Sequence, residues 1–443
     1  MPQLISDQLR DQLVKEALES FKDISDWTHA KAAGFKPVYD VDGNAAYYEV
    51  IINDPQGTNR GYVLISATEN DLPIVELSET AKPPFHRLAA KVGDQNFKMV
   101  YFGPGYMAAE DANGNLLGGI GERPTAIPPE ARLHSRGEAS NYRSVPPRDP
   151  LPSIPRRGIH RKSNRWSYPE LKQTFIRPRP TAQKLESYWI AAKSPNSPCI
   201  FDTASANCPN GHSYFLQIPK NTPPNSNNHW SGCGATAWMN LLGWHHLNFT
   251  SSLLDADRKQ NGPYIENLTM KLHDYLGGFT WPEDMGRGFE FLRNRLFHTS
   301  DYWYRYDWWI TDEYWVFKVG RDAIRKKWPF IVGYFSDRHY AIGYQTRECT
   351  GHVVTIQVDS ANIITMRVVH RYIRIYPGWN RDDSDDKWIP METIFGIWAA
   401  YDFEKLPNGS VGVEIKRYYW VIRVDDRRVL SGGRLDLSLH AKE

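Results

Sequence analysis

A proline- and arginine-rich stretch in the first half of the chain constrains the fold more than any other feature. Between residues 126 and 184 these two residue types recur in short runs, among them Pro146-Pro147-Arg148, Pro155-Arg156-Arg157 and Arg177-Pro178-Arg179-Pro180. Proline lacks a backbone N–H and clashes with helical geometry, so this stretch suits neither a helix interior nor the centre of a sheet. We therefore expect an extended linker that divides the 443 residues into two domains, 1–125 and 185–443.

The first expected domain has the pattern of a small α+β unit. Apolar side chains recur at helical spacing over residues 4–33, and Gly34 can end that helix in a left-handed conformation. Three runs rich in β-branched and aromatic residues follow, at 46–52, 61–67 and 72–77. A helix followed by a small antiparallel sheet predicts an α+β fold.

The second expected domain has its main helix first and its strands later. One helix is predicted over 234–246 and another over 312–327. The predicted strands follow at 330–335, 340–344, 353–358, 364–369 and 372–376, and a further one at 417–424 is expected to join the same sheet. This order is again typical of an α+β fold.

The composition is typical of a soluble globular protein, with 41% hydrophobic and 23% charged residues. A net charge of +2 gives no reason to expect a nucleic-acid partner. Without a run of about 18 apolar residues, we expect no membrane span. The start, Met1-Pro2-Gln3-Leu4, lacks the pattern of a secretory signal. The compartment stays open between the cytoplasm and secretion after removal of a signal.

Cysteine and histidine spacing leaves the redox state open and gives little support to a metal site. Cys199 and Cys208 are nine positions apart, so they either close a small disulfide loop or stay free thiols. His229 and Cys233 lie four apart, but the neighbouring His245-His246 pair points to different faces of a helix, so a shared zinc ion is disfavoured. We expect neither a metal nor a cofactor.

The strongest chemical signal is a cysteine between two glycines at the start of the predicted helix 234–246. Gly232-Cys233-Gly234 leads directly into a run of alanine, tryptophan, methionine and leucine. Only a thiolate is a good nucleophile, and the partial positive charge of a helix N-terminus lowers the pKa of a thiol there. The glycines leave room for a substrate backbone, and nearby backbone N–H groups can face a developing oxyanion.

A histidine at the start of a strand supplies the partner for that thiol. His339 follows an apolar strand and a tight turn and opens the run Tyr340-Ala341-Ile342-Gly343-Tyr344. A base held at a strand end can take the proton of a thiol and later protonate the leaving amine. Each residue alone is more often structural, but the two together in this order indicate a Cys–His dyad.

These motifs resemble those of papain-like cysteine peptidases of the streptopain type. The resemblance rests on Gly232-Cys233-Gly234-Ala235-Thr236-Ala237, on the block from Pro329 to Tyr344, and on residues 61–67 with 72–75, which are similar to the family's propeptide. It implies a papain-like catalytic domain, with a helix half and an antiparallel sheet half, behind a small α+β prodomain that covers its cleft. The implied activity is that of a cysteine endopeptidase made as a self-inhibited zymogen, with polypeptide substrates and its own prodomain as partners.

Carried over position by position, the resemblance assigns Cys233 as the nucleophile and His339 as the base. Gln217 is the best match for the glutamine that donates to the oxyanion. Two candidates stay open for the residue that orients the imidazole. Asp359 ends the predicted strand that follows His339, whereas Asn380 lies in Tyr376-Pro377-Gly378-Trp379-Asn380, which is similar to the family's Asn-Trp-Gly-Trp.

A departure from the family pattern keeps rival functions open, because Tyr376 stands where the family has its asparagine. The orienting residue is then either lost, moved to Asn380, or replaced by Asp382. If it is lost, the chain is a noncatalytic or toxin-like papain-fold binding protein. An acyltransferase or amidase that uses the same dyad is a further alternative, since a fold does not fix the reaction.

Overall fold

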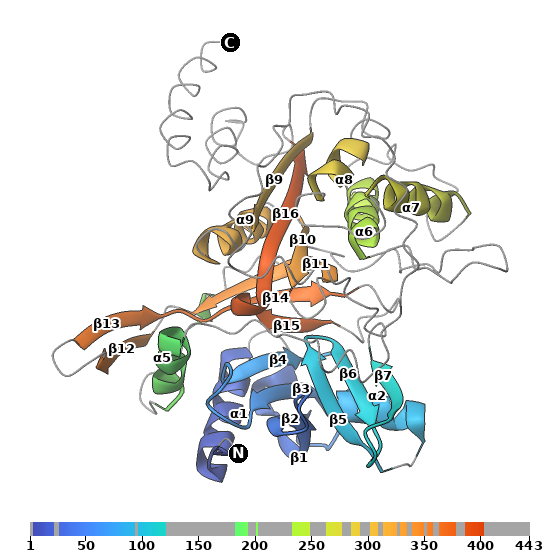
Figure 1. Cartoon of the computed structure of the whole chain (residues 1–443). Helices are drawn as coiled ribbons and strands as arrows, with labels where there is room; N and C mark the ends of the chain where they lie inside the picture. The colour runs from blue at the N-terminus through green and yellow to red at the C-terminus, as the bar shows by residue number, and fades with distance from the viewer. Residues whose placement is uncertain are drawn as a thin grey trace.

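The structure is a computed structural model of the whole chain (Figure 1). It describes residues 3–21, 26–93, 96–120, 182–193, 201–202, 233–248, 263–276, 285–292, 302–308, 313–325, 328–334, 339–349, 352–357, 363–377 and 386–402. The predictions for 417–424, Cys199, Cys208 and His229 fall outside these residues.

Residues 7–120 form what we call the N-terminal unit. Its first part contains α1 (Asp7–Phe21), the short 3-10 helix η1 (Asp26–His29), β1 (Lys31–Tyr39), β2 (Ala45–Asn53), β3 (Asn59–Ser66) and β4 (Ile74–Ser78). Its second part contains α2 (Pro84–Val92), β5 (Lys98–Gly103), β6 (Tyr106–Glu110) and β7 (Leu116–Ile120). β1 pairs antiparallel with β2 and parallel with β5, so it joins the two parts into one sheet.

The expected helix over residues 4–33 is too long. α1 ends at Phe21, and β1 begins at Lys31 and contains Gly34 within the strand. β1 pairs with strands on both of its sides, so residues 31–33 at the end of the expected helix belong to the sheet. The three expected strands are confirmed as β2, β3 and β4, with their ends shifted by one or two residues.

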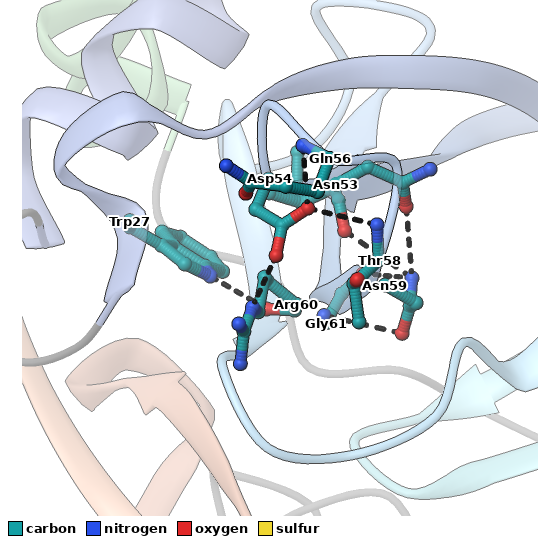
Figure 2. A network of polar contacts seen from close by, with 9 residues as sticks. Trp27, Asn53, Asp54, Gln56, Thr58, Asn59, Arg60 and Gly61 are labelled. Atoms are coloured by element: carbon teal, nitrogen blue, oxygen red, sulfur yellow. Dashed lines mark hydrogen bonds and ion pairs between the residues drawn. The ribbon is translucent and has the colours of Figure 1, made fainter.

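Tight turns closed by aspartate join neighbouring strands of this unit. At the β2–β3 turn, Asp54 Oδ1 accepts the N–H of Thr58 at 2.8 Å, and its Oδ2 accepts Arg60 Nε at 3.0 Å (Figure 2). The Arg60 carbonyl accepts Trp27 Nε1–H at 2.6 Å, which ties η1 to this hairpin. Gly57 adopts a φ of 84° in the turn, a conformation that favours glycine. Two other turns are closed in the same way, by Asp40 and Asp111.

Residues 182–402 form what we call the C-terminal unit. Its described helices are α5 (Ala182–Lys193), α6 (Cys233–Asn248), α7 (Pro263–Tyr275), α8 (Met285–Leu292), α9 (Glu313–Arg325) and the short 3-10 helix η6 (Met391–Thr393). Its described strands are β8 (Phe201–Asp202), β9 (Tyr302–Trp308), β10 (Phe330–Tyr334), β11 (His339–Cys349), β12 (His352–Gln357), β13 (Ile363–Val368), β14 (Arg371–Tyr376), β15 (Lys387–Pro390) and β16 (Ile394–Asp402). Across the ranges described, no helix is both long and apolar enough to cross a membrane.

One sheet runs through both units. Its order is β7-β6-β5-β1-β2-β3-β4-β15-β14-β11-β10-β16-β9, with β8 pairing to β11 beside this path. β4 and β15 meet antiparallel where the two units join, with Trp388 opposite Leu77. Figure 1 shows the N-terminal unit below this junction and most of the C-terminal unit above it, with α5 beside α1. β12 and β13 pair only with each other in the described sheets, as a projecting hairpin that contacts α5.

The hydrophobic core, like the sheet, is shared by the two units. Each of the three apolar clusters combines side chains from the N-terminal unit with side chains from the C-terminal unit. The largest cluster surrounds α6, α9, β10 and β11 and includes Phe102 and Tyr106 of the N-terminal unit. Helices combined with a large, mostly antiparallel sheet confirm the expected α+β class.

Candidate active site

Cys233 is the first residue of α6, a helix of 16 residues. Most side chains from Ala235 to Trp244 are buried, since the helix lies inside the largest apolar cluster. Cys233 itself is only partly buried and packs against that cluster. The backbone N–H groups of a first helical turn have no partner within the helix and carry partial positive charge, which favours a thiolate at this position.

His339 is the first residue of β11 and pairs with Tyr334 at the end of β10. The residue is 2% exposed. The Nε2 atom lies 2.8 Å from the carbonyl oxygen of Pro377, which directly follows β14. A carbonyl oxygen only accepts, so Nε2 carries the hydrogen, and a neutral imidazole then has its acceptor at Nδ1.

Helix α6 packs against β11 and also contacts β10. The element that begins with Cys233 and the strand that begins with His339 are therefore direct neighbours in the C-terminal unit. α6 lies on one side of β16 in Figure 1, and α9 lies on the other. A helix-borne nucleophile and a strand-borne base can act together only if their elements are neighbours, and α6 and β11 meet this condition.

Two tyrosine rings enclose His339. Tyr334, in the neighbouring strand, lies edge-on to the imidazole with ring centroids 5.4 Å apart. Tyr106 lies edge-on to it as well, at 5.8 Å, and belongs to β6 of the N-terminal unit. Since Tyr106 is itself only 2% exposed, the N-terminal unit covers the histidine and shields it from water.

Burial lowers the pKa of His339 from 6.5 to about 4. Desolvation is the main cause, because a charged imidazolium loses its hydration in this environment. The positive charge of Lys387 lowers the pKa further, whereas the hydrogen bond to Pro377 opposes both effects. The histidine is therefore neutral near pH 7 and accepts a proton only at a high energetic cost while it remains covered.

The turn that presents Tyr106 is fixed by a buried carboxylate. Glu76 Oε2 accepts the N–H of Gly105 at 3.0 Å, and Lys387 Nζ lies 3.7 Å from Glu76 Oε1. Gly105 has a φ of 78°, and a Cβ at this position would lie 3.2 Å from Lys387 Nζ. The positive φ therefore favours glycine here, and a Cβ would in addition press on the ammonium group of Lys387. Tyr106 follows directly, so its position over His339 is tied to Glu76.

Three of the predicted site residues lie outside the described residues: Gln217, Asp359 and Asn380. The described strands still bear on the choice between Asp359 and Asn380 as the residue that orients the imidazole of His339. β12, which ends two residues before Asp359, belongs to the separate hairpin, whereas β14, which ends just before Pro377, pairs with β11. The segment that contains Asn380 therefore begins beside the histidine strand. Within the described ranges, no group of three or more His, Cys, Asp or Glu residues is arranged to hold a metal ion.

Reasoning from the sequence missed Pro377 and Tyr106 as neighbours of His339. Pro377 was within reach of that reasoning, because it stands in the segment similar to the family's Asn-Trp-Gly-Trp. Tyr106 follows Gly103-Pro104-Gly105, which is a plain turn signal but carries no indication of what the turn contacts.

Comparisons with known proteins are sparse. No protein-family model and no curated protein matches the chain. Among solved structures, a fragment of prointerpain A from Prevotella intermedia aligns with 83% of this chain and 98% of its own length. The identity is 10% and the TM-score is 0.36, values that do not establish a shared fold.

Proposed function

We propose that this chain is a papain-like cysteine peptidase in which Cys233 is the nucleophile and His339 is the base. The observation that carries the proposal is the placement of Cys233 at the start of a buried helix that packs against the strand beginning with His339. A helix N-terminus favours the thiolate, and an imidazole that donates through Nε2 carries its lone pair at Nδ1, which is the proposed proton acceptor.

The proposed reaction has two stages. In the first, the Cys233 thiol gives its proton to His339 and bonds to the peptide carbonyl carbon; the C–N bond then breaks, and the imidazolium protonates the leaving amine. In the second, water gives a proton to His339, attacks the thioester and releases the carboxylic acid and the thiol. The N–H of Cys233 and the side chain of Gln217 are the proposed oxyanion donors.

The Pro377 carbonyl is the proposed orienting group for His339. It accepts the hydrogen bond from Nε2 that a side-chain oxygen accepts in other nucleophile–histidine sites. A main-chain acceptor does not depend on the side chain at 359 or 380. Asp359→Ala and Asn380→Ala are therefore expected to keep the rate of Cys233 alkylation within about threefold, whereas a loss of about 100-fold in either variant assigns the orienting role to that side chain.

The N-terminal unit is the proposed inhibitory prodomain. Its Tyr106 covers His339, and burial that holds the pKa of His339 near 4 opposes formation of a thiolate–imidazolium pair. This agrees with a peptidase made in a latent form. The same burial is the observation that favours the rival function, a noncatalytic papain-fold binding protein, because a permanently neutral and covered histidine does not activate a thiol.

Thiol alkylation followed by mass mapping separates these functions. The comparison is made in the Tyr106→Ala protein, which lacks the ring that covers His339. With iodoacetamide or an epoxide probe, Cys233 of this protein should react faster than Cys349, and adding His339→Ala should slow the labelling of Cys233 by about 100-fold. His86→Ala is the matched control, since it removes an exposed imidazole from α2. If Cys233 reacts no faster than Cys349, or if His339→Ala leaves its rate unchanged, the thiol is not activated. Aminolysis products in place of hydrolysis would instead indicate an acyltransferase.

A further inference from the structure

The junction between the two units is a continuation of the sheet. β4 of the N-terminal unit pairs with β15 of the C-terminal unit, with Leu77 opposite Trp388. At the same junction the Ser78 hydroxyl donates a hydrogen bond to the carbonyl of Asp386. Paired strand edges satisfy each other's backbone groups, so separation would leave both edges open to water or to another chain.

Aromatic side chains from both units interlock beside this junction. The Phe21 ring of α1 lies edge-on to Tyr372 and to Trp388, with centroids 5.4 and 5.5 Å apart. The Arg347 guanidinium lies 4.7 Å from the centroid of the same Phe21 ring. Trp388 is fully buried, and Phe21 is 2% exposed. Separation of the units would expose this apolar surface in one piece, which is the signature of an obligate interface.

Buried charges fix the register of the junction. Glu79 Oε1 lies 2.8 Å from Arg374 Nη1, with side-chain exposures of 5% and 12%. The Glu76–Lys387 pair is more deeply buried, at 0% and 2%. Such pairs add little net stability, but each has one carboxylate in the N-terminal unit and one cation in the C-terminal unit. They therefore select this one way of joining the units.

Helix α5, the first described element after the linker, is held by the N-terminal unit. Trp189 Nε1 donates to the carbonyl of Asp71 at 2.8 Å, and Gln12 Nε2 donates to the carbonyl of Ala192 at 2.6 Å. Tyr188 and Ala191 pack into an apolar cluster made mostly of N-terminal side chains. Helix α5 thus contacts the very unit that a cut in the linker would be expected to free.

We propose that the N-terminal unit is a permanent half of the molecule, which stays bound through the β4–β15 junction when the linker is cut. Cutting the linker then leaves Tyr106 over His339, so the latent site is not opened by that cut alone. The association rests on the described contacts and does not depend on the peptidase proposal. A removable prodomain, by contrast, would leave once it was severed.

The test places a site-specific protease sequence in the linker of the full chain. Cys233→Ala is included so that self-cleavage cannot contribute. After complete cutting, confirmed on a denaturing gel, native mass spectrometry and size-exclusion chromatography should show both fragments in one complex, including in about 1 M salt, which screens the exposed charges. Fragments that separate without denaturant would overturn the proposal.

Two further measurements sharpen the result. Trp388→Ala should release the N-terminal fragment from the cut protein more readily than Val353→Ala, which changes an exposed side chain on the β12–β13 hairpin. The NMR titration of His339 should be the same before and after cutting. A shift of its pKa toward 6.5 on cutting would overturn the proposal that the site stays covered. Failure of Cys233 to react with thiol probes would contradict the peptidase proposal but leave this one standing.

Discussion

Replacing Tyr106 with alanine is expected to speed the alkylation of Cys233 about tenfold. Burial is the main reason that the pKa of His339 is about 4 and not 6.5, and at about 1.4 kcal/mol per pH unit this disfavours the imidazolium by about 3 kcal/mol. Tyr106 is one of two rings that enclose the imidazole, and Tyr334 remains in the variant. Assigning roughly half of the effect to Tyr106 gives about tenfold more of the thiolate–imidazolium pair.

The assay measures the rate constant for iodoacetamide labelling of Cys233 as a function of pH, with mass mapping to identify the labelled thiol. The increase in labelling rate should be largest between about pH 5 and 7. In this range the higher imidazole pKa of the Tyr106→Ala protein first allows the thiolate–imidazolium pair to form. Tyr47→Ala is the matched control. It removes another buried tyrosine from the N-terminal unit, one whose hydroxyl hydrogen-bonds to Asp71 at 2.8 Å.

Two outcomes would refute the reasoning. A folded Tyr106→Ala protein whose labelling rate stays within about twofold of the parent across this pH range would show that the ring does not control the dyad. Equal acceleration by Tyr47→Ala would show that the gain comes from general loosening of the N-terminal unit.

Three predictions concern stability. Burial raises the pKa of Glu16 to about 7, so the folded protein keeps a proton that the unfolded chain releases; stability should fall as the pH rises from about 4.5 to 7, and Glu16→Gln should reduce this slope in urea unfolding. Trp388→Ala should lower the free energy of unfolding by about 3–5 kcal/mol, because the indole is fully buried where the units join. Gly61→Ala should destabilise more than Gly57→Ala in the same assay. Both have positive φ, but a Cβ at Gly61 would lie 1.8 Å from the Ser78 carbonyl oxygen, whereas nothing lies within 4 Å at Gly57.

Each of these three has an outcome that contradicts it. The pKa of Glu49 is also raised by burial, to about 8, so Glu16→Gln should remove only part of the slope, and an unchanged slope would exclude Glu16 as a contributor. If Trp388→Ala lowered the free energy of unfolding no more than Val353→Ala does, the junction would not be tightly packed. Equal costs at Gly61 and Gly57 would show that φ alone, and not the approach of Ser78, decides the effect.

Elements with strong local periodicity could be predicted from the sequence. The helix expected over 234–246 is α6, and the strands expected at 330–335, 340–344 and 372–376 are β10, β11 and β14. Apolar spacing and turn residues are local signals, and in these segments they agree with the tertiary packing. The bounds differ, because β11 continues to Cys349, beyond its apolar run.

Contacts between segments distant in the sequence could not be predicted. β15 has only four residues, and nothing in Lys387–Pro390 indicates that it pairs with β4. The contact of His339 with Pro377 spans 38 residues and depends on β14 being the neighbour of β11. For the same reason the sequence could not distinguish Asp359 from the 376–380 segment as the source of the orienting group, since that choice depends on the order of strands in the sheet.

The β4–β15 junction also has a consequence during synthesis. The hydrogen bond from Ser78 to Asp386 joins residues 308 positions apart, so at about 5–20 residues per second a ribosome makes β4 roughly 15–60 s before its partner strand. Through that interval the β4 edge of the nascent N-terminal unit has no strand to pair with, although all five of its residues are buried in the finished protein. An open apolar edge is a template for a neighbouring nascent chain. Production of this protein should therefore depend on a holding chaperone, and the N-terminal unit made by itself should aggregate.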